Sequence, residues 1–158
     1  MFNTTLCYIE KDGAYLMLHR IKKKNDINHD KWVGIGGKLE EGESPFDCVR
    51  REVSEEVGLT LCSVEYRGVI TFVSDIYGTE YMHLFHSFDF SGEMKEICDE
   101  GVPKWVKITD IEKLPIWEGD KIFLKLLAEN APFFSLKLEY VGDRLVSHTL
   151  EFAKKQTP

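Results

Sequence analysis

The sequence has no long hydrophobic run, and this absence argues against a membrane protein. No stretch approaches the roughly 20 apolar residues that a helix needs to cross a bilayer. The N-terminal segment 1–9 also lacks the charged-then-apolar order of a signal peptide. We therefore expect no membrane partner and a cytoplasmic location.

Cysteine is scarce and scattered, which argues against a disulfide framework. The four cysteines are Cys7, Cys48, Cys62 and Cys98, and no two of them form a CxxC pair. Secreted mini-proteins space their cysteines far more densely. Reduced thiols are the better interpretation, in agreement with a cytoplasmic protein.

Positive charge is also in short supply. The chain has 20 Lys and Arg against 27 Asp and Glu, a formal net charge of -7. Proteins that bind nucleic acid polymers through the phosphates need a basic face, so we expect no such partner. An acidic protein that acts on a phosphorylated ligand usually recruits a divalent cation.

The length of 158 residues and the 43% hydrophobic content fit one domain over residues 1–158. Runs rich in β-branched and aromatic residues predict strands at 4–9, 14–19, 65–73, 81–90, 104–108, 133–140 and 144–152. Helices are predicted at 45–57 and 120–129, and segment 21–30 reads as a polar loop. Because strands and helices do not alternate regularly, we expect an α+β fold with a mixed sheet between helices.

The helix over 45–57 carries signals at both ends. Ser44 is a good N-cap, Pro45 suits the first helical position, and Asp47 follows the cap by three residues. Gly58 suits the end of the helix, where a left-handed residue is often needed. The helical period places Phe46, Val49, Val53 and Val57 on one apolar stripe that predicts the core face.

Three glutamates lie beside that stripe. Glu55 and Glu56 follow Glu52 by three and four residues, so we expect all three to project toward one shared point, with Arg51 turned away by about 100°. Two like charges ~5 Å apart repel by roughly 3 kcal/mol at an effective dielectric of 20. A solvated acidic face is the plain alternative, but oxygen ligands in this arrangement favour Mg²⁺, Mn²⁺ or Ca²⁺.

Segment 37–59 reads Gly, five residues, Glu, seven residues, Arg-Glu-Val, one residue, Glu-Glu, one residue, Gly-Leu. This pattern resembles the Nudix box with every defining position filled. A Rossmann loop has the pattern G-x-G-x-x-G, but after Gly34 and Gly36 no glycine follows at the third required position. We expect Gly36 and Gly37 to form a tight loop that brings the backbone of Gly37 and Lys38 near a metal.

The resemblance implies an α/β/α sandwich with a mixed sheet, a loop-helix-loop motif and Mg²⁺ as cofactor, with Mn²⁺ as a substitute. It implies that Arg51 supports the site by pairing with Glu43 or Glu55. The catalytic residues implied are Arg51, Glu52, Glu55, Glu56 and Glu100, and the metal-binding residues are Gly37, Glu52, Glu55, Glu56 and Glu100.

The chain also resembles the MutT-like branch that hydrolyses oxidised purine nucleoside triphosphates. Shared stretches are 32–38, Asp99-Glu100 ahead of Trp105, 117–120 and 140–152. By this likeness Trp117 stacks on the purine, although a plain packing role is equally compatible with the sequence, and Asp120 hydrogen-bonds the purine edge. The implied substrate-binding residues are Lys23, Val33, Gly36, Gly37, Lys38, Phe72, Trp117 and Asp120.

Three positions depart from the mammalian pattern of that branch. Val33 replaces an asparagine, Gly119 replaces the first of two adjacent aspartates, and Ile27 replaces an aromatic residue. The reaction implied is cleavage of a purine nucleoside triphosphate into a monophosphate and pyrophosphate, as in nucleotide-pool sanitation. The alternatives are hydrolysis of nucleotide sugars or dinucleoside polyphosphates, and a nucleotide-sensing domain without turnover.

Overall fold

The computed structural model describes residues 1–153. In chain order the elements are β1 (Phe2–Lys11), β2 (Ala14–His19), β3 (Trp32–Val33), α1 (Pro45–Val57), β4 (Thr60–Ser74), β5 (Gly78–Ser91), β6 (Val102–Lys107), the 3-10 helix η1 (Ile108–Lys113), α2 (Asp120–Ala128), β7 (Phe134–Val141) and β8 (Arg144–Phe152). Among these residues no helix is both long and apolar enough to cross a membrane.

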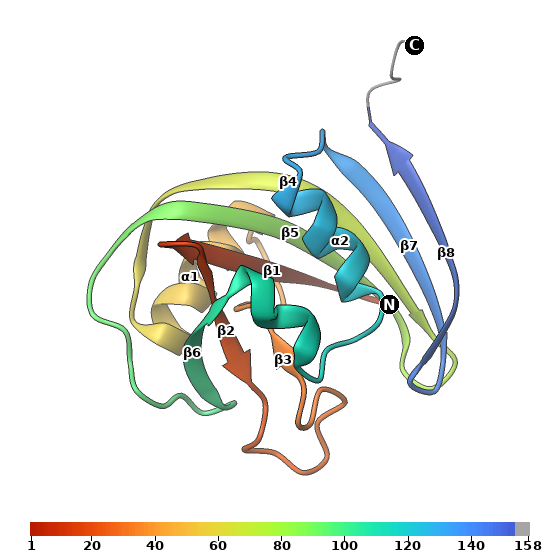
Figure 1. Cartoon of the computed structure of the whole chain (residues 1–158), viewed down its shortest axis with the longest axis horizontal. Helices are drawn as coiled ribbons and strands as arrows, with labels where there is room; N and C mark the ends of the chain where they lie inside the picture. The colour runs from red at the N-terminus through yellow and green to blue at the C-terminus, as the bar shows by residue number, and fades with distance from the viewer. Residues whose placement is uncertain (154–158) are drawn as a thin grey trace.

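The strands form one mixed sheet in the order β3-β2-β1-β5-β4-β7-β8, and β6 pairs with β2. The pairs β1 with β5 and β4 with β7 are parallel, whereas the other pairs are antiparallel. The N-terminal strand therefore runs through the middle of the sheet, between β2 and β5 (Figure 1).

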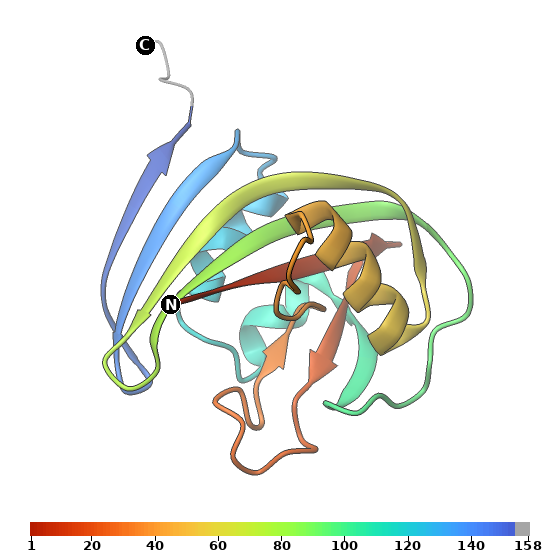
Figure 2. The same ribbon diagram turned by 180° about the vertical axis from the view of Figure 1, so that it is seen from behind.

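The two α-helices cover opposite faces of this sheet. Helix α2 lies in front of the strands in Figure 1, and α1 lies in front in the view from behind (Figure 2). Side chains of a strand point alternately to the two faces of the sheet, so successive residues pack in two separate cores. Tyr15 packs on the α2 side and Leu16 on the α1 side. The predicted α+β sandwich is confirmed.

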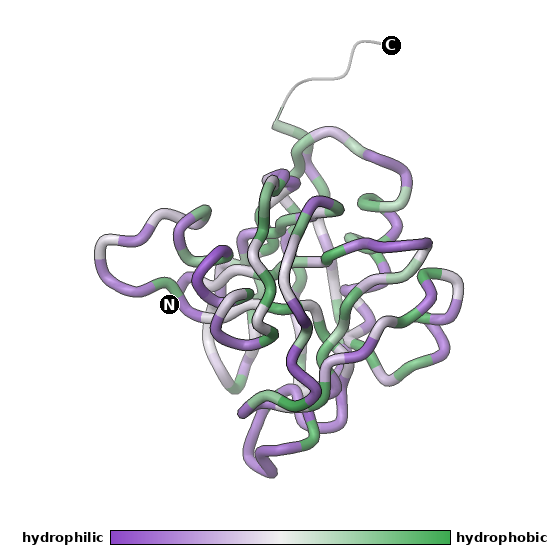
Figure 3. Tube along the Cα trace, turned by 90° about the vertical axis from the view of Figure 1, so that its left-hand side faces the viewer, coloured by the Kyte–Doolittle hydropathy of each residue, from purple (hydrophilic) through white to green (hydrophobic). Residues whose placement is uncertain are grey.

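Hydropathy along the chain follows this layering. In Figure 3 hydrophobic and hydrophilic stretches alternate along the chain through the body of the molecule, while the loop at the foot of the view is mostly hydrophilic. Helix α1 buries Val49, Val53 and Val57, as its apolar stripe predicts. Helix α2 buries Phe123 and Leu127 against the other face.

The local signals at α1 are confirmed. The Ser44 side chain accepts a hydrogen bond from the backbone of Asp47, whose side chain accepts one from the Ser44 backbone. Gly58 ends the helix at φ 77°, a left-handed conformation that glycine adopts without strain. The turn between β1 and β2 has Asp12 at φ 51° and Gly13 at φ 75°.

Two short elements were not predicted. Strand β3 has only two residues, and its register to β2 joins Val33 to Leu18 and Trp32 to His19. Its conformation depends on that distant partner rather than on local periodicity. The 3-10 helix η1 follows β6 directly and buries Ile111. The strands β4 and β5 are also longer than their predicted ranges.

Candidate active site

The loop before α1 is packed tightly between β1 and the helix. The backbone N–H of Thr5 donates to the carbonyl of Gly37 at 2.9 Å. A Cβ atom on Gly36 would lie 1.8 Å from the Thr5 carbonyl oxygen, and one on Gly37 would lie 2.4 Å from the carboxyl carbon of Glu52. Position 36 therefore requires glycine, because the obstructing atom belongs to the backbone of β1, whereas a side chain at position 37 would displace the carboxylate of Glu52.

Arg51 lies among the motif carboxylates. Its guanidinium donates to Glu43 at 2.7 and 2.8 Å, to Glu52 at 2.8 Å and to Glu55 at 3.2 Å. It also donates to the carbonyl of Lys38 at 3.1 Å. The expectation that Arg51 points away from Glu52 and Glu55 is wrong, because its long side chain folds back along the helix toward the loop. The expected pairings with Glu43 and Glu55 are both present.

The Arg51 guanidinium, followed by the Glu40 backbone N–H, lowers the pKa of Glu43 to about 2. Glu43 therefore remains ionised at any physiological pH and keeps its hold on the guanidinium. Glu43 holds the guanidinium at Nε and Nη2, so the group cannot rotate freely. The third nitrogen, Nη1, therefore sets the positions of Glu52 and Glu55. Arg51 thus positions the acids of the motif.

The acids do not all meet at one point. Glu55 is 62% exposed and turns toward Arg51. Within residues 1–153, no three acidic, histidine or cysteine side chains are gathered as a ready-made ion site, and the expected convergence of Glu52, Glu55 and Glu56 is corrected at Glu55. The physical reason is the placement of the arginines: Arg51 holds Glu55 on its own side together with Glu52, whereas Glu56 lies beside Glu100, which Arg20 binds at 2.9 Å.

Glu56 is the acid left without a cation. It is half-buried, and its Oε2 atom has no hydrogen-bond partner in the described part of the chain. Burial, then the neighbouring carboxyls of Glu100 and Glu52, raise its pKa well above the ordinary range. Glu100 comes from the loop before β6, so the fold brings together two acids that lie far apart in sequence.

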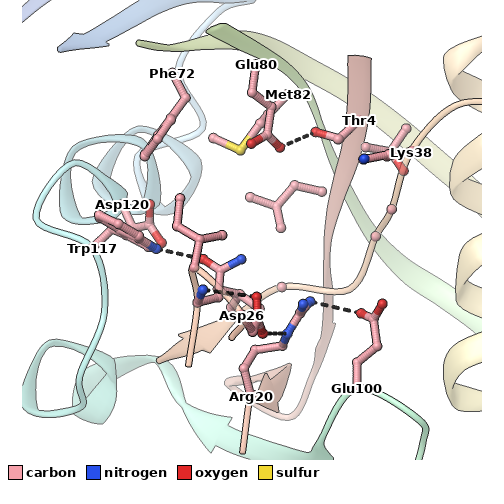
Figure 4. A pocket seen from close by; sticks show the side chains of 18 of the residues that line it. Thr4, Arg20, Asp26, Lys38, Phe72, Glu80, Met82, Glu100, Trp117 and Asp120 are labelled. Atoms are coloured by element: carbon pink, nitrogen blue, oxygen red, sulfur yellow. Dashed lines mark hydrogen bonds and ion pairs between the residues drawn. The ribbon is translucent and has the colours of Figure 1, made fainter. Parts of the chain in front are cut away.

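A cavity of about 410 Å³ opens beside these acids (Figure 4). One end is lined by Gly37, Lys38 and Glu100, and the other by Trp117 and Asp120. Of the residues predicted to bind substrate, those lining the cavity are Val33, Gly36, Gly37, Lys38, Phe72, Trp117 and Asp120. Lys23 is exposed on the loop after β2 and is not among the lining residues, so its predicted place in the pocket is corrected.

Trp117 is fixed by its surroundings. Its indole Nε1 donates to Asn28 Oδ1 at 2.7 Å, and its ring meets Phe72 edge-on with centroids 5.3 Å apart. The Lys31 ammonium lies 4.6 Å from the ring centroid. The residue is 5% exposed, so it packs in the core and also lines the cavity. The bond to Asn28 ties the loop after β2 to the entrance of α2.

Asp120 is the first residue of α2 and is 6% exposed. Burial raises the pKa of its carboxyl to about 8, with Lys31 opposing and Glu80 adding to the shift. Near neutral pH this carboxyl mostly keeps its proton, so it can both donate and accept a hydrogen bond. Such a group suits the edge of a nucleobase, where donors and acceptors alternate.

Several lining residues were not predicted. Arg20 and Asp26 pair at 2.7 Å at the mouth of the cavity, while Thr4, Glu80 and Met82 line its inner wall. Each stands in a strand or loop without a motif around it. A sequence signal for them would have required knowing the strand register, which joins segments distant in the chain.

Comparison with known proteins agrees with this geometry. The sequence matches the family described as NUDIX domain over residues 3–127. Oxidized purine nucleoside triphosphate hydrolase from Danio rerio is 34% identical over 152 residues, which cover 93% of this chain and 92% of that protein. The uncharacterized Nudix hydrolase YvcI from Bacillus subtilis (strain 168) is 28% identical over 152 residues with the same coverage of both chains.

A solved structure is similar over almost the whole chain. The crystal structure of a MutT mutator protein from Bacillus halodurans superposes with a TM-score of 0.85 at 28% identity, covering 96% of this chain and 98% of that one. The family match, the near full-length relatives and the motif acids beside the cavity agree with one another. The chain therefore belongs to the Nudix family and is a hydrolase of the MutT-like type.

Proposed function

We propose that the protein cleaves purine nucleoside triphosphates, oxidised ones included, into a nucleoside monophosphate and pyrophosphate. The observation that carries this proposal is that one cavity joins the motif loop and Glu100 to the wall formed by Trp117 and Asp120. The relative from Danio rerio, named for oxidised purine nucleoside triphosphates, supports the same substrate class. The free thiols of all four cysteines support a cytoplasmic role in nucleotide-pool sanitation.

The residues at the motif end of the cavity fit a divalent cation. The candidate donors are all oxygens, supplied by Glu52, Glu55, Glu56, Glu100 and the Gly37 carbonyl, which suits Mg²⁺ with Mn²⁺ as a substitute. The buried, unpartnered Oε2 of Glu56 between two other carboxyls is the kind of group that a cation would satisfy. When bound, the cation would lower the pKa of a water molecule and offset charge on the phosphates.

The chain's own residues hold the reactants in place. Arg51 fixes Glu52, and Glu100, which lines the cavity, takes a proton from the attacking water. The water oxygen bonds to phosphorus, the bond to the bridging oxygen breaks, and pyrophosphate leaves. Trp117 and Asp120 orient the base, while Lys38 lines the cavity beside Gly37, where the phosphates would lie.

The experiment that tests this proposal measures pyrophosphate and phosphate release with Mg²⁺ for a panel of substrates. The panel contains normal and oxidised dNTPs, nucleotide sugars and dinucleoside polyphosphates. We expect pyrophosphate from purine triphosphates above all. Turnover of nucleotide sugars or dinucleoside polyphosphates alone would overturn the proposal, and tight nucleotide binding without any release would favour a nucleotide-sensing domain.

A further inference from the structure

The inner wall of the cavity carries a second acid, Glu80. In the sheet register, Glu80 on β5 is the partner of Phe2 on β1 and of Phe72 on β4. Side chains two apart on a strand share a face, so Met82 lies on the same side as Glu80. All four residues line the cavity, and Figure 4 shows Glu80 beside Met82 and Phe72, across from Asp120.

Glu80 is held as a hydrogen-bond acceptor. The hydroxyl of Thr4 donates to its Oε2 atom at 2.7 Å, which leaves Oε1 for a further donor. Burial raises the pKa of Glu80, while the Thr4 hydroxyl and the Lys38 charge oppose that shift by favouring the ionised form. The charge of Glu80 in turn raises the pKa of Asp120, and both side chains line the same cavity.

A purely structural role explains this placement poorly. Phe2, Phe72 and Met82 line the cavity with Glu80 and present apolar surface, and a carboxylate there loses hydration in return for one hydroxyl hydrogen bond and the charge of Lys38. A threonine hydroxyl is satisfied equally well by a neutral or backbone acceptor. The carboxylate gains its advantage when a ligand brings a second N–H donor to the cavity.

Purines differ in the donors that they present. All carry hydrogen-bonding groups on the Watson–Crick edge, which Asp120 can read. On the imidazole edge, an ordinary purine offers the N7 lone pair, which a carboxylate repels. An 8-oxopurine carries a hydrogen on N7 instead, which a carboxylate accepts.

We propose that Glu80 is a specificity-determining residue that accepts the N7–H of an 8-oxopurine while Asp120 binds the opposite edge. The inference rests on the proposed function for its substrate and adds the residue that selects the oxidised base. Thr4 orients the carboxylate by binding Oε2, and Oε1 is the atom that meets the base.

Binding of monophosphates without metal tests the inference apart from turnover. We expect the wild type to bind 8-oxo-dGMP at least about tenfold more tightly than dGMP, since a hydrogen bond to a charged group is involved. Glu80→Gln should reduce this ratio to near one, because its amide can turn and donate to N7 of dGMP. Glu151→Gln, at an exposed position of β8, is the matched control and should keep the wild-type ratio.

Two further measurements separate N7 recognition from other roles. The wild type should bind 7-deaza-dGMP more tightly than dGMP, because the repelled lone pair is absent, and Glu80→Gln should lose that preference. Thr4→Val should lower the ratio in the same direction but by less, because Glu80 then loses its orienting bond. Melting temperatures establish that each variant is folded.

The inference is overturned if Glu80→Gln keeps the wild-type ratio, or if it weakens 8-oxo-dGMP and dGMP equally. It is also overturned if the variant changes only the preference between ribose and deoxyribose, which would place Glu80 at the sugar. Absence of triphosphate hydrolysis would instead count against the proposed function, while the monophosphate ratios would still decide the role of Glu80.

Discussion

The hydroxyl oxygen of Tyr140 on β7 accepts a hydrogen bond from the backbone N–H of Gly119 at 2.7 Å, immediately before Asp120. This contact draws the start of α2 against the sheet. A Cβ atom on Gly119 would lie 2.5 Å from Leu138 Cδ1 and 2.8 Å from the Tyr140 oxygen. The cavity wall beside Trp117 therefore carries one aspartate, because a side chain at the preceding position would press on the buried side chains of Leu138 and Tyr140.

Gly119→Asp should destabilise the protein rather than restore a second acidic contact. Overpacking of this kind costs roughly 1 to 3 kcal/mol, or about 2 to 10 °C in melting temperature for a domain of this size. Differential scanning calorimetry measures the change. Glu118→Asp, at the exposed neighbouring position, should leave the melting temperature almost unaltered. An unchanged melting temperature for Gly119→Asp would contradict this expectation, because it would mean that Leu138 and Tyr140 on β7 move aside at little cost.

Arg51→Lys should reduce turnover by about 10- to 100-fold, the range typical of groups that support metal ligands. An ammonium cannot bind Glu43 through two nitrogens while also reaching Glu52 and Glu55. Steady-state pyrophosphate release is the measurement. The neighbouring Arg50→Lys is the control, since Arg50 is exposed and its guanidinium lies over the Phe46 ring. Equal losses in both variants would contradict a positioning role for Arg51.

Glu56→Gln preserves shape and removes the acid whose Oε2 lacks a partner. We expect turnover to fall at least about a hundredfold, whereas the dissociation constant for nucleotide changes much less. Single-turnover kinetics and calorimetric titration separate the two quantities. The same change at exposed Glu41 should have little effect on either. If both variants behaved alike, the catalytic assignment of Glu56 would have no basis.

Asp120 should make stability depend on pH. Its pKa is about 8 in the folded protein and about 3.9 in an unfolded chain, so the folded state holds the proton more tightly. This contribution is complete below pH ~4 and is lost as pH rises toward 8, at a slope of at most about 1.4 kcal/mol per pH unit. Urea unfolding at several pH values measures it.

Asp120→Asn should remove this part of the pH dependence, so the variant gains stability relative to the wild type as the pH rises. Asp143→Asn, at an exposed turn, should follow the wild-type curve. Parallel curves for Asp120→Asn and the wild type would show that Asp120 is ionised throughout this range.

Local chemistry explains why α1 could be predicted and Arg51 could not. The helix begins at Ser44 and ends at Gly58 because caps act on neighbouring residues. The direction of the Arg51 side chain depends on Glu43 and on the Lys38 carbonyl. Both belong to the loop that precedes α1 and lies against it. A helical projection contains only the helix, so it turned Arg51 away from its partners.

The same distinction holds for the cavity. Trp117 and Asp120 were predicted because they lie in a recognisable segment at the start of α2, and both line the cavity. Glu80 stands alone in a β-run, and its position follows from the register of β5 with β1 and β4. Non-local pairing of this kind leaves no trace in the residues adjacent to Glu80.

The central place of β1 also governs how the chain can fold. Phe2 pairs with Glu80 in one parallel ladder, and Gly68 pairs with Phe134 in another, so each ladder closes a long loop of chain. Loop-closure entropy must be overcome before such contacts contribute, which slows folding relative to a hairpin or a helix pair. The cavity walls come from β1, β5 and α2, so no early local intermediate contains a complete pocket. A ligand that binds in this cavity would therefore stabilise the assembled sheet as a whole rather than any single element.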